Sequence, residues 1–325
     1  FYLCNFLGIF FVNKKIVINK TSDIFLIKFP IIFPIIYFFS LYTFPEHENL
    51  ILFTTLLLLA EPHFGATWPF LLNIKNKEEI KNKRVIYIIF PIMLAIFSLV
   101  GFFTFYSVFI LLFFTFNIFH VTRQSIGISK LFASNFEQIN FQKYVIYGVN
   151  ILFFIVGILR FNLTNLIQLD TFYITSFVII VISISSIIFL IKFKDFGNLL
   201  TLITGCLIFL PICFMEKPIH ALVMGVTMHY SQYLVLTLKV HEGRKKDPDI
   251  KMESKNSFSY FSNFILIISI YGLFMSILAF APNYDATLKN LIVIPLIGQM
   301  IHFYLDTFLW RFQEQHHRDV TYKYI

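Results

Sequence analysis

The sequence predicts an all-α fold, a polytopic bundle of about ten transmembrane helices. Of the 325 residues, 58% are hydrophobic and only 14% are charged, whereas a soluble domain carries about a quarter charged residues. Apolar runs such as IFLIKFPIIFPIIYFFSLYTF and FYITSFVIIVISISSIIFLI reach the roughly 20 residues that a helix needs to cross a bilayer. We therefore expect an integral membrane protein.

The ten expected spans are long apolar runs, each bounded by polar or charged residues. In chain order they cover residues 24–44, 50–73, 85–105, 107–131, 143–160, 171–192, 199–214, 219–239, 259–281 and 288–310. The loop 240–258 is the only sizeable polar insertion, and it is too short to fold alone. The sequence thus predicts one integral membrane domain over 1–325, with an N-terminal segment over 1–23 and a tail over 311–325. Because the chain starts at Phe1 rather than at Met, we expect the natural N-terminus to lie further upstream.

Lysine and arginine gather in alternate connections between these spans. The basic connections include KKIVINK, NKEEIKNKR and KVHEGRKKDPDIKMESK, whereas PEHEN, NLTNLIQLD and PNYDATLK carry few positive charges. Because cytoplasmic loops are rich in Lys and Arg, we expect both termini, the 240–258 loop and the tail to be cytoplasmic. The same topology accounts for the net charge of +8, and we expect no nucleic-acid partner.

Four histidines lie inside apolar spans: His63, His120, His229 and His302. The expected topology makes their four spans run in the same direction, from outside to inside. Each histidine then lies about 10–14 residues from the outer end, which at about 1.5 Å per residue is a depth of roughly 15–21 Å. Imidazole is costly to bury in lipid without a partner. An interhelical hydrogen bond would explain any one of them, but four at one depth indicate a shared site.

Polar residues near these histidines extend the candidate site, because residues three and four apart on a helix share a face. Asp306, four residues after His302, is expected to hold the second ring nitrogen of that histidine. Glu61 and Gln124 are expected to lie around the ligands, and Arg123 either holds charge near the site or makes a structural ion pair. The full set is Glu61, Arg123, Gln124, Gln232, Tyr233 and Asp306.

Helix-breaking and small residues accompany the histidines. Pro62 is expected to kink its helix just before His63. Gly225 and Gly298 each lie four residues before one of the other histidines, on the same helix face. Glycine at such a position either lets helices approach closely or leaves room for a ligand.

A histidine pair follows the last span, in RFQEQHHRD. The spacing Gln313-x-x-His316-His317 resembles the last histidine box of membrane desaturases and hydroxylases. The earlier boxes of that family, which are paired histidines a few residues apart, are absent from this sequence. We therefore reject that assignment and interpret the pair as structural, at the membrane interface.

Four neutral imidazoles suit iron, copper, zinc or nickel, and one interpretation is an all-histidine Fe(II) site with open positions for dioxygen. A second is haem held axially between facing histidines, in an electron-transfer protein. A third is a proton relay through the histidines, Glu61 and Asp306, in a proton-coupled transporter. The sequence shows no internal repeat of the kind that transporters usually have, which counts against the third.

Three short motifs resemble those of the Brp/Blh group of membrane β-carotene dioxygenases: PHFGA, an FH pair in a later span, and HY after a long gap. The resemblance implies iron held by His63, His120 and His229, and cleavage of β-carotene to retinal. That family has a second histidine one turn after the last motif, where this chain has Tyr233, so His302 is expected to supply the fourth ligand. FHVTRQSIG and HFYLDTFLWRF also resemble segments of uncharacterised bacterial multi-pass proteins, a resemblance that implies a bacterial inner membrane. The leading hypothesis is an iron-dependent oxygenase for a lipid-soluble substrate, such as a carotenoid, that enters from the bilayer.

Overall fold

In the computed structural model, described over residues 17–163, 170–247 and 257–325, every regular element is a helix. The predicted all-α fold is confirmed for these residues. Eight described helices are long and apolar enough to cross a membrane, and the count is nine if the bent pair Lys20–Lys28 and Ile32–Thr43, with 56° between its halves, is one span. The predicted span 219–239 corresponds to α12 (Pro218–Lys245), which is long enough but not apolar enough to be counted with them. The count of ten spans and the cytoplasmic placement of both termini remain predictions.

The chain divides into two compact units. The first takes the described residues of Phe1–Thr43 and Val121–Gln232, and the second takes Phe44–His120 and Tyr233–Ile325. The boundaries fall inside two long helices, α8 (Tyr106–Phe132) and α12, so each of these helices contributes one end to each unit.

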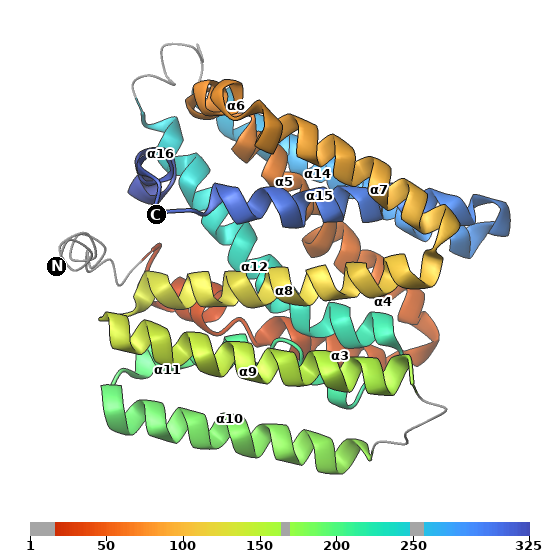
Figure 1. Cartoon of the computed structure of the whole chain (residues 1–325), viewed down its shortest axis with the longest axis vertical. Coiled ribbons are helices and arrows are strands. Elements are labelled where there is room, and N and C mark those ends of the chain that lie inside the picture. The colour runs from red at the N-terminus through yellow and green to blue at the C-terminus, as the bar shows by residue number, and fades with distance from the viewer. Residues whose placement is uncertain (1–16, 164–169, 248–256) are drawn as a thin grey trace. The chain divides into compact units, whose positions relative to one another are not determined.

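Three helices of the first unit begin at Asn or Asp residues. Side-chain oxygens of Asn135, Asp170 and Asp195 accept hydrogen bonds from first-turn amides, which stabilises a helix start. The helices are α9 (Phe136–Phe161), α10 (Thr171–Phe193) and α11 (Phe196–Leu207), and they pack on one another (Figure 1). Between α9 and α11, Gln142 Nε2 donates to the Asn198 side chain at 3.0 Å, a polar contact of the kind that joins helices in membranes. The other elements are α2 (Lys20–Ser22), the π-helix η2 (Asp23–Lys28), α3 (Ile32–Thr43) and the 3-10 turn η7 (Leu210–Cys213).

The second unit holds the helices that carry three of the four predicted histidine ligands. α5 (Glu61–Leu71) packs against α14 (Ser257–Tyr284) and α15 (Val293–Leu309), and α15 also packs against α7 (Phe90–Thr104) (Figure 1). Pro62 is the second residue of α5, inside the continuous helical stretch Pro45–Leu71, where its missing amide hydrogen removes one hydrogen bond of the helix. The helical irregularity expected there is a π-helical segment, η4 (Leu56–Ala60), directly before α5. The other elements are η3 (Pro45–His47), α4 (Glu48–Thr55), η5 (Ile74–Asn76), α6 (Lys77–Asn82), η6 (Val85–Ile89), η8 (Ala286–Ile292), α16 (Gln315–Val320) and η9 (Tyr322–Tyr324).

Glycines let helices approach closely in both units. In the second unit, a Cβ added at Gly298 would lie 2.6 Å from the Tyr271 hydroxyl, and one at Gly65 would lie 2.8 Å from the Tyr271 ring. Tyr271 of α14 therefore fills the space that both glycines leave on α5 and α15. In the first unit, a Cβ at Gly225 would lie 1.8 Å from the backbone oxygen of Ile208. Of the two roles expected for Gly225 and Gly298, close approach is the one observed.

Two segments differ from the sequence prediction. The loop expected over 240–258 begins later, because α12 continues to Lys245; its residues 248–256 lie outside the described residues. The tail over 311–325 is partly helical and is held by Arg244, whose buried guanidinium donates to the carbonyl oxygens of Val320 at 2.9 Å and Phe70 at 3.3 Å. Of the N-terminal segment 1–23, residues 1–16 also lie outside the described residues.

Candidate metal centre

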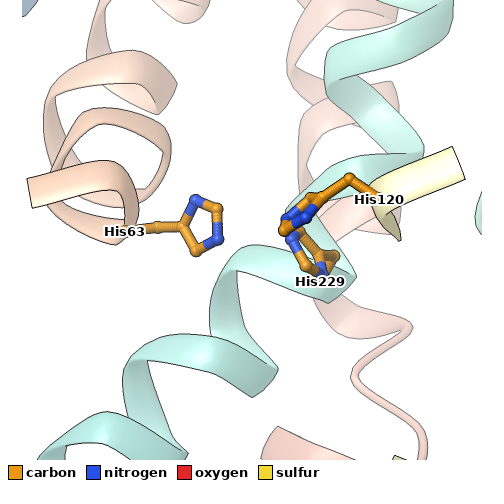
Figure 2. A group of neighbouring side chains, drawn as sticks. All are labelled: His63, His120 and His229. Carbon is orange, nitrogen blue, oxygen red and sulfur yellow. The ribbon is translucent and has the colours of Figure 1, made fainter. Parts of the chain in front are cut away.

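Three of the predicted histidine ligands lie together in the second unit. His63 is on α5, His120 is on the end of α8 that belongs to this unit, and His302 is on α15. Their exposed fractions are 0%, 4% and 1%. Figure 2 shows the rings of His63 and His120 directed toward one another from α5 and α8. We call His63, His120 and His302 the histidine cluster.

His120 and His302 make a close nitrogen–nitrogen contact, with their Nε2 atoms 3.2 Å apart. Two nitrogen ligands of one metal ion, each about 2.0–2.1 Å from it, are separated by about 2.9–3.4 Å in tetrahedral or octahedral geometry. The ring centroid of His63 is 4.5 Å from that of His302, and a nitrogen of His63 lies within 4.8 Å of one of His120. His120 and His302 thus have the spacing that one metal ion requires, and the His63 ring packs directly beside them.

A carboxylate joins this group. Asp306 lies one turn after His302 on α15, and one of its oxygens lies within 4.8 Å of ring nitrogens of His120 and His302. Two histidines and one carboxylate, with open positions for further ligands, are a known ligand set of non-haem Fe(II) oxygenases. Asp306 is therefore placed to bind a metal itself, beyond the orienting role expected from its spacing.

A line of hydrogen bonds connects His302 to Asp306 through two hydroxyl groups. Nδ1 of His302 lies 2.6 Å from the Thr67 hydroxyl, which lies 3.2 Å from the Tyr233 hydroxyl. Tyr233 in turn hydrogen-bonds Asp306, and Trp310 Nε1 donates to Asp306 Oδ1 at 2.7 Å. When Nδ1 of His302 carries the proton and donates a hydrogen bond to the Thr67 hydroxyl, the Nε2 lone pair is available to a metal ion. The sequence prediction that Tyr233 belongs to the site is consistent with this arrangement.

Aromatic side chains surround the histidine cluster. The ring of Phe303 lies 4.8 Å from that of His120, and the ring of Phe64 lies 5.1 Å from that of His302. The Tyr233 ring packs at 4.6 Å from His63. Such surroundings are apolar and of low dielectric, so charge placed among the histidines interacts strongly with the ligands.

Glu61 is fully buried and contacts a glutamine. Gln299 Nε2 on α15 donates to Glu61 Oε1 at 3.0 Å, and Oε2 has no hydrogen bond to any described residue. Residues two apart on a helix do not face the same way, so Glu61 and His63 project from different faces of α5. The partner that the structure gives Glu61 is therefore Gln299.

The other predicted site residues lie in the first unit. His229 and Gln232 are buried on α12, and Gln232 Nε2 donates to the carbonyl oxygen of Ile27 at 2.6 Å. On α8, Arg123 is exposed and Gln124 is half-buried. The ligand role of His229 and the roles expected for Arg123 and Gln124 remain predictions.

Sequence reasoning missed three residues that contact the site: Thr67, Gln299 and Trp310. Thr67 follows His63 by four residues, and Trp310 follows Asp306 by four. The helix-face rule that selected Asp306 would have found both. Gln299 on α15 contacts Glu61 on α5, and no spacing along the chain indicates a contact between two different helices.

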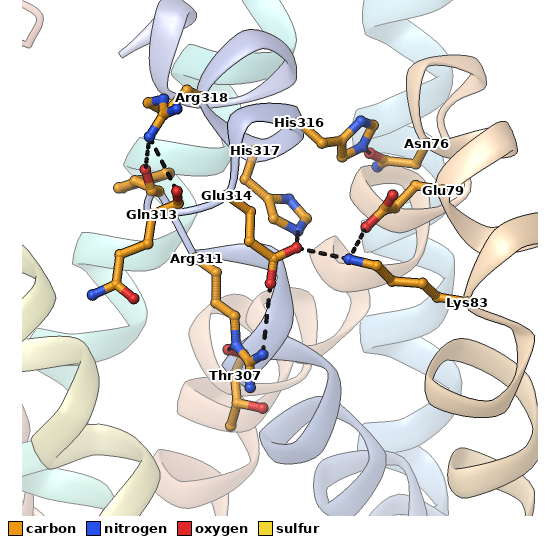
Figure 3. Close-up of polar contacts among 11 residues, drawn as sticks. Asn76, Glu79, Lys83, Thr307, Arg311, Gln313, Glu314, His316, His317 and Arg318 are labelled. Atoms are coloured by element: carbon orange, nitrogen blue, oxygen red, sulfur yellow. Dashed lines mark hydrogen bonds and ion pairs between the residues drawn. The ribbon is translucent and has the colours of Figure 1, made fainter. Parts of the chain in front are cut away.

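A second polar cluster lies just beyond the ends of the candidate spans Val85–Thr104 and Ala286–Leu309 (Figure 3). The Lys83 ammonium lies 2.7 Å from Glu79 Oε1 and 2.8 Å from Glu314 Oε2. Hydrogen bonds to Glu314 and Glu79 raise the pKa of Lys83, and the bond to Lys83 lowers the pKa of Glu314. Burial lowers the pKa of His317 to about 4, so its ring is neutral at pH 7. We call Glu79, Lys83, Glu314 and His317 the edge cluster.

No protein-family model, no curated protein and no solved structure matches the chain. The resemblance to the membrane β-carotene dioxygenases therefore remains an expectation that rests on the sequence motifs.

Proposed function

We propose that the protein is a membrane-embedded, iron-dependent oxygenase, in a bacterial inner membrane, that acts on a lipid-soluble substrate such as a carotenoid. The observation that carries this proposal is the 3.2 Å separation between Nε2 of His120 and Nε2 of His302, which fits two adjacent ligands of one metal ion. His63 and Asp306 bring further donor atoms within 4.8 Å of His120. Bound Fe(II) would supply the redox chemistry with dioxygen that side chains lack.

The same geometry favours a single non-haem ion over a haem. Two axial imidazoles of a haem lie on opposite sides of the iron, with their nitrogens about 4 Å apart and the porphyrin ring between them. The 3.2 Å between His120 and His302 leaves no space for that ring. A nearby carboxylate, Asp306, also suits an ion with several open positions.

The residues around the histidine cluster also support the proposal, because their hydrogen bonds hold the side chains of His302 and Asp306 in one orientation. Thr67 fixes one nitrogen of His302, and Tyr233 and Trp310 fix Asp306. Such outer partners orient metal ligands and set which nitrogen carries the proton. A site prepared in this way needs little rearrangement when the ion or the substrate binds.

The aromatic side chains beside the cluster support an apolar substrate. Phe303 contacts both Phe64, with ring centroids 6.1 Å apart, and Phe113, at 5.8 Å. Sites lined by aromatic rings bind a ligand by burying its apolar surface, with a few polar groups to orient it. A polyene dissolved in the bilayer meets these requirements and reaches the helices without crossing water.

Iron binding by the detergent-purified protein tests the proposal. After anaerobic loading with Fe(II), His302→Ala should bind about one ion fewer per chain than the wild type. The reason is that a metal site loses most of its affinity when one of its direct ligands is removed. His47→Ala is the matched control, since His47 is exposed, and it should bind as much iron as the wild type. Equal iron in both variants would contradict the proposal.

Activity is measured on the same samples. The iron-loaded wild type should consume dioxygen when β-carotene is added in mixed micelles, and an aldehyde product should appear. Iron binding without any reaction of a carotenoid would retain the metal site and reject this substrate class. His47→Ala again serves as the control for handling and detergent.

A further inference from the structure

The edge cluster brings together three metal-binding side chains from two distant parts of the chain. Glu79 lies on α6, Glu314 is the N-cap residue of α16, and His317 lies within α16. One oxygen of each glutamate and one nitrogen of His317 all lie within 4.8 Å of one another. The RFQEQHHRD segment, interpreted from sequence as structural, thus supplies two of the three donors.

His317 is buried here with one ring nitrogen that makes no hydrogen bond to any described residue. The residue is 2% exposed, and the nitrogen concerned is Nε2. It is directed at Glu314, whose Oε2 lies 4.0 Å away (Figure 3). Burying a polar atom without a hydrogen bond is unfavourable. This nitrogen therefore indicates a position that a ligand can take.

The space between the two glutamates already holds positive charge. The Lys83 ammonium contacts one oxygen of each, at 2.7 Å and 2.8 Å, and Arg311 lies 3.7 Å from the other oxygen of Glu314. A divalent ion placed there would keep both charge contacts and also accept the lone pair of the His317 nitrogen. The glutamate side chains are 14% and 34% exposed, so an ion from the aqueous phase can reach them.

We propose that Glu79, Glu314 and His317 form a second metal site, for a divalent ion of the Zn²⁺ type, and that Lys83 leaves the glutamates when the ion binds. Zinc takes imidazole nitrogen and carboxylate oxygen together, at about 2.0–2.2 Å, and accepts water as a fourth ligand. Mg²⁺ and Ca²⁺ prefer oxygen ligands alone, so the histidine selects against them. The bound ion would tie the C-terminal segment to α6, independently of the function proposed for the histidine cluster.

Zinc titration of the full-length, chelator-treated protein tests this site. The measurement uses the His120→Ala/His302→Ala double variant, so that His63 is the one histidine left in the histidine cluster. Competition with a chromophoric chelator should then report about one Zn²⁺ per chain. Glu314→Gln and His317→Gln, each made in this background, should weaken binding by at least about 10-fold. His316→Gln is the matched control, because its Nε2 bonds Asn76, and it should bind as the background does.

Lys83→Met provides a test that leaves all three proposed zinc ligands in place. Removing the competing ammonium should tighten zinc binding several-fold relative to the background. The proposal is overturned if the background binds no zinc, if His317→Gln and His316→Gln bind equally well, or if Lys83→Met leaves the affinity unchanged. Loss of iron from the histidine cluster does not bear on this result, since two of its three histidines are already replaced.

Discussion

The hydroxyl of Thr67 lies 2.6 Å from Nδ1 of His302, and this contact joins α5 to α15 beside the histidine cluster. On the other side of the same ring, Nε2 faces Nε2 of His120 at 3.2 Å. A metal-bound imidazole usually donates its second N–H to a fixed acceptor. Thr67 is therefore a positioning residue, which sets the ring orientation and the tautomer of His302.

Thr67→Val should lower the affinity for Fe(II) by about 10- to 100-fold, the range expected when the partner of a metal ligand is lost. It should also destabilise the metal-free protein by about 1–3 kcal/mol, because the buried Nδ1 loses its partner. Thr67→Ser keeps the hydroxyl and should stay close to the wild type in both measurements. Equal Fe(II) affinities for the valine and serine variants would show that Thr67 does not orient His302.

Alanine substitutions at three glycines should destabilise the protein in a fixed order. Gly225→Ala should be the most damaging, since its Cβ would meet the backbone oxygen of Ile208 at 1.8 Å. Gly65→Ala should follow, because its Cβ would press on the ring of Tyr271 at 2.8 Å, and Gly298→Ala should cost least, because the hydroxyl end of Tyr271 can shift. Overpacking typically costs about 1–3 kcal/mol.

Gly148→Ala is the matched control for this series. A Cβ there would meet no atom within 4 Å, and alanine is favoured over glycine in a helix by about 0.5–1 kcal/mol. Its thermal unfolding temperature should therefore equal or exceed that of the wild type. A series in which Gly148→Ala is as unstable as Gly225→Ala would contradict the close packing described here.

The class of fold and part of the site follow from the sequence, because they depend on composition and on helical spacing. Long apolar runs predicted the helices, and polar groups inside them selected His63, His120 and His302, which the second unit brings together. Asp306 was found by its four-residue spacing from His302. These inferences need only the helix geometry and the cost of burying a polar group.

The remaining features depend on contacts between helices, which spacing along one helix does not contain. The Glu61 carboxylate accepts a hydrogen bond from Gln299, on a helix more than two hundred residues away in sequence. His317 is expected at the membrane interface because it follows the last span, and that position does not indicate that only 2% of it is exposed. The C-terminal tail is expected only as a segment beyond the last span, and its docking depends on Arg244 of another helix. Each case required the tertiary structure.

His229 is predicted from the sequence to be a further ligand, and its spacing supports a test. It lies four residues before Tyr233 on α12, so the two residues project from one face of that helix. His229→Ala should weaken Fe(II) binding by at least about 10-fold. His220→Gln is the control, since His220 is also buried on α12 but bonds Tyr37 at 2.6 Å. If both variants bind iron equally, His229 is not a ligand.

Arg244→Met should release the C-terminal tail. Its buried guanidinium bonds the carbonyl oxygens of Val320 and Phe70, and hydrogen bonds from a charged group are worth about 1.5–3 kcal/mol each. Hydrogen exchange over residues 315–325 should become at least about 10-fold faster. Lys246→Met removes the same charge from an exposed position at the same helix end and should leave exchange unchanged. Similar exchange in both variants would assign the docking to other contacts.

The central claim, that His120 and His302 bind one metal ion together, is tested most directly by X-ray absorption at the iron edge. The sample is the Glu314→Gln variant loaded anaerobically with one equivalent of Fe(II), so that the edge cluster does not compete. We expect nitrogen and oxygen neighbours of the iron at about 2.0–2.2 Å, together with the outer-shell scattering of at least two imidazole rings. When His302→Gln is added to this variant, the scattering of one imidazole ring should be lost. A spectrum without imidazole scattering, or one that His302→Gln leaves unchanged, would contradict the central claim.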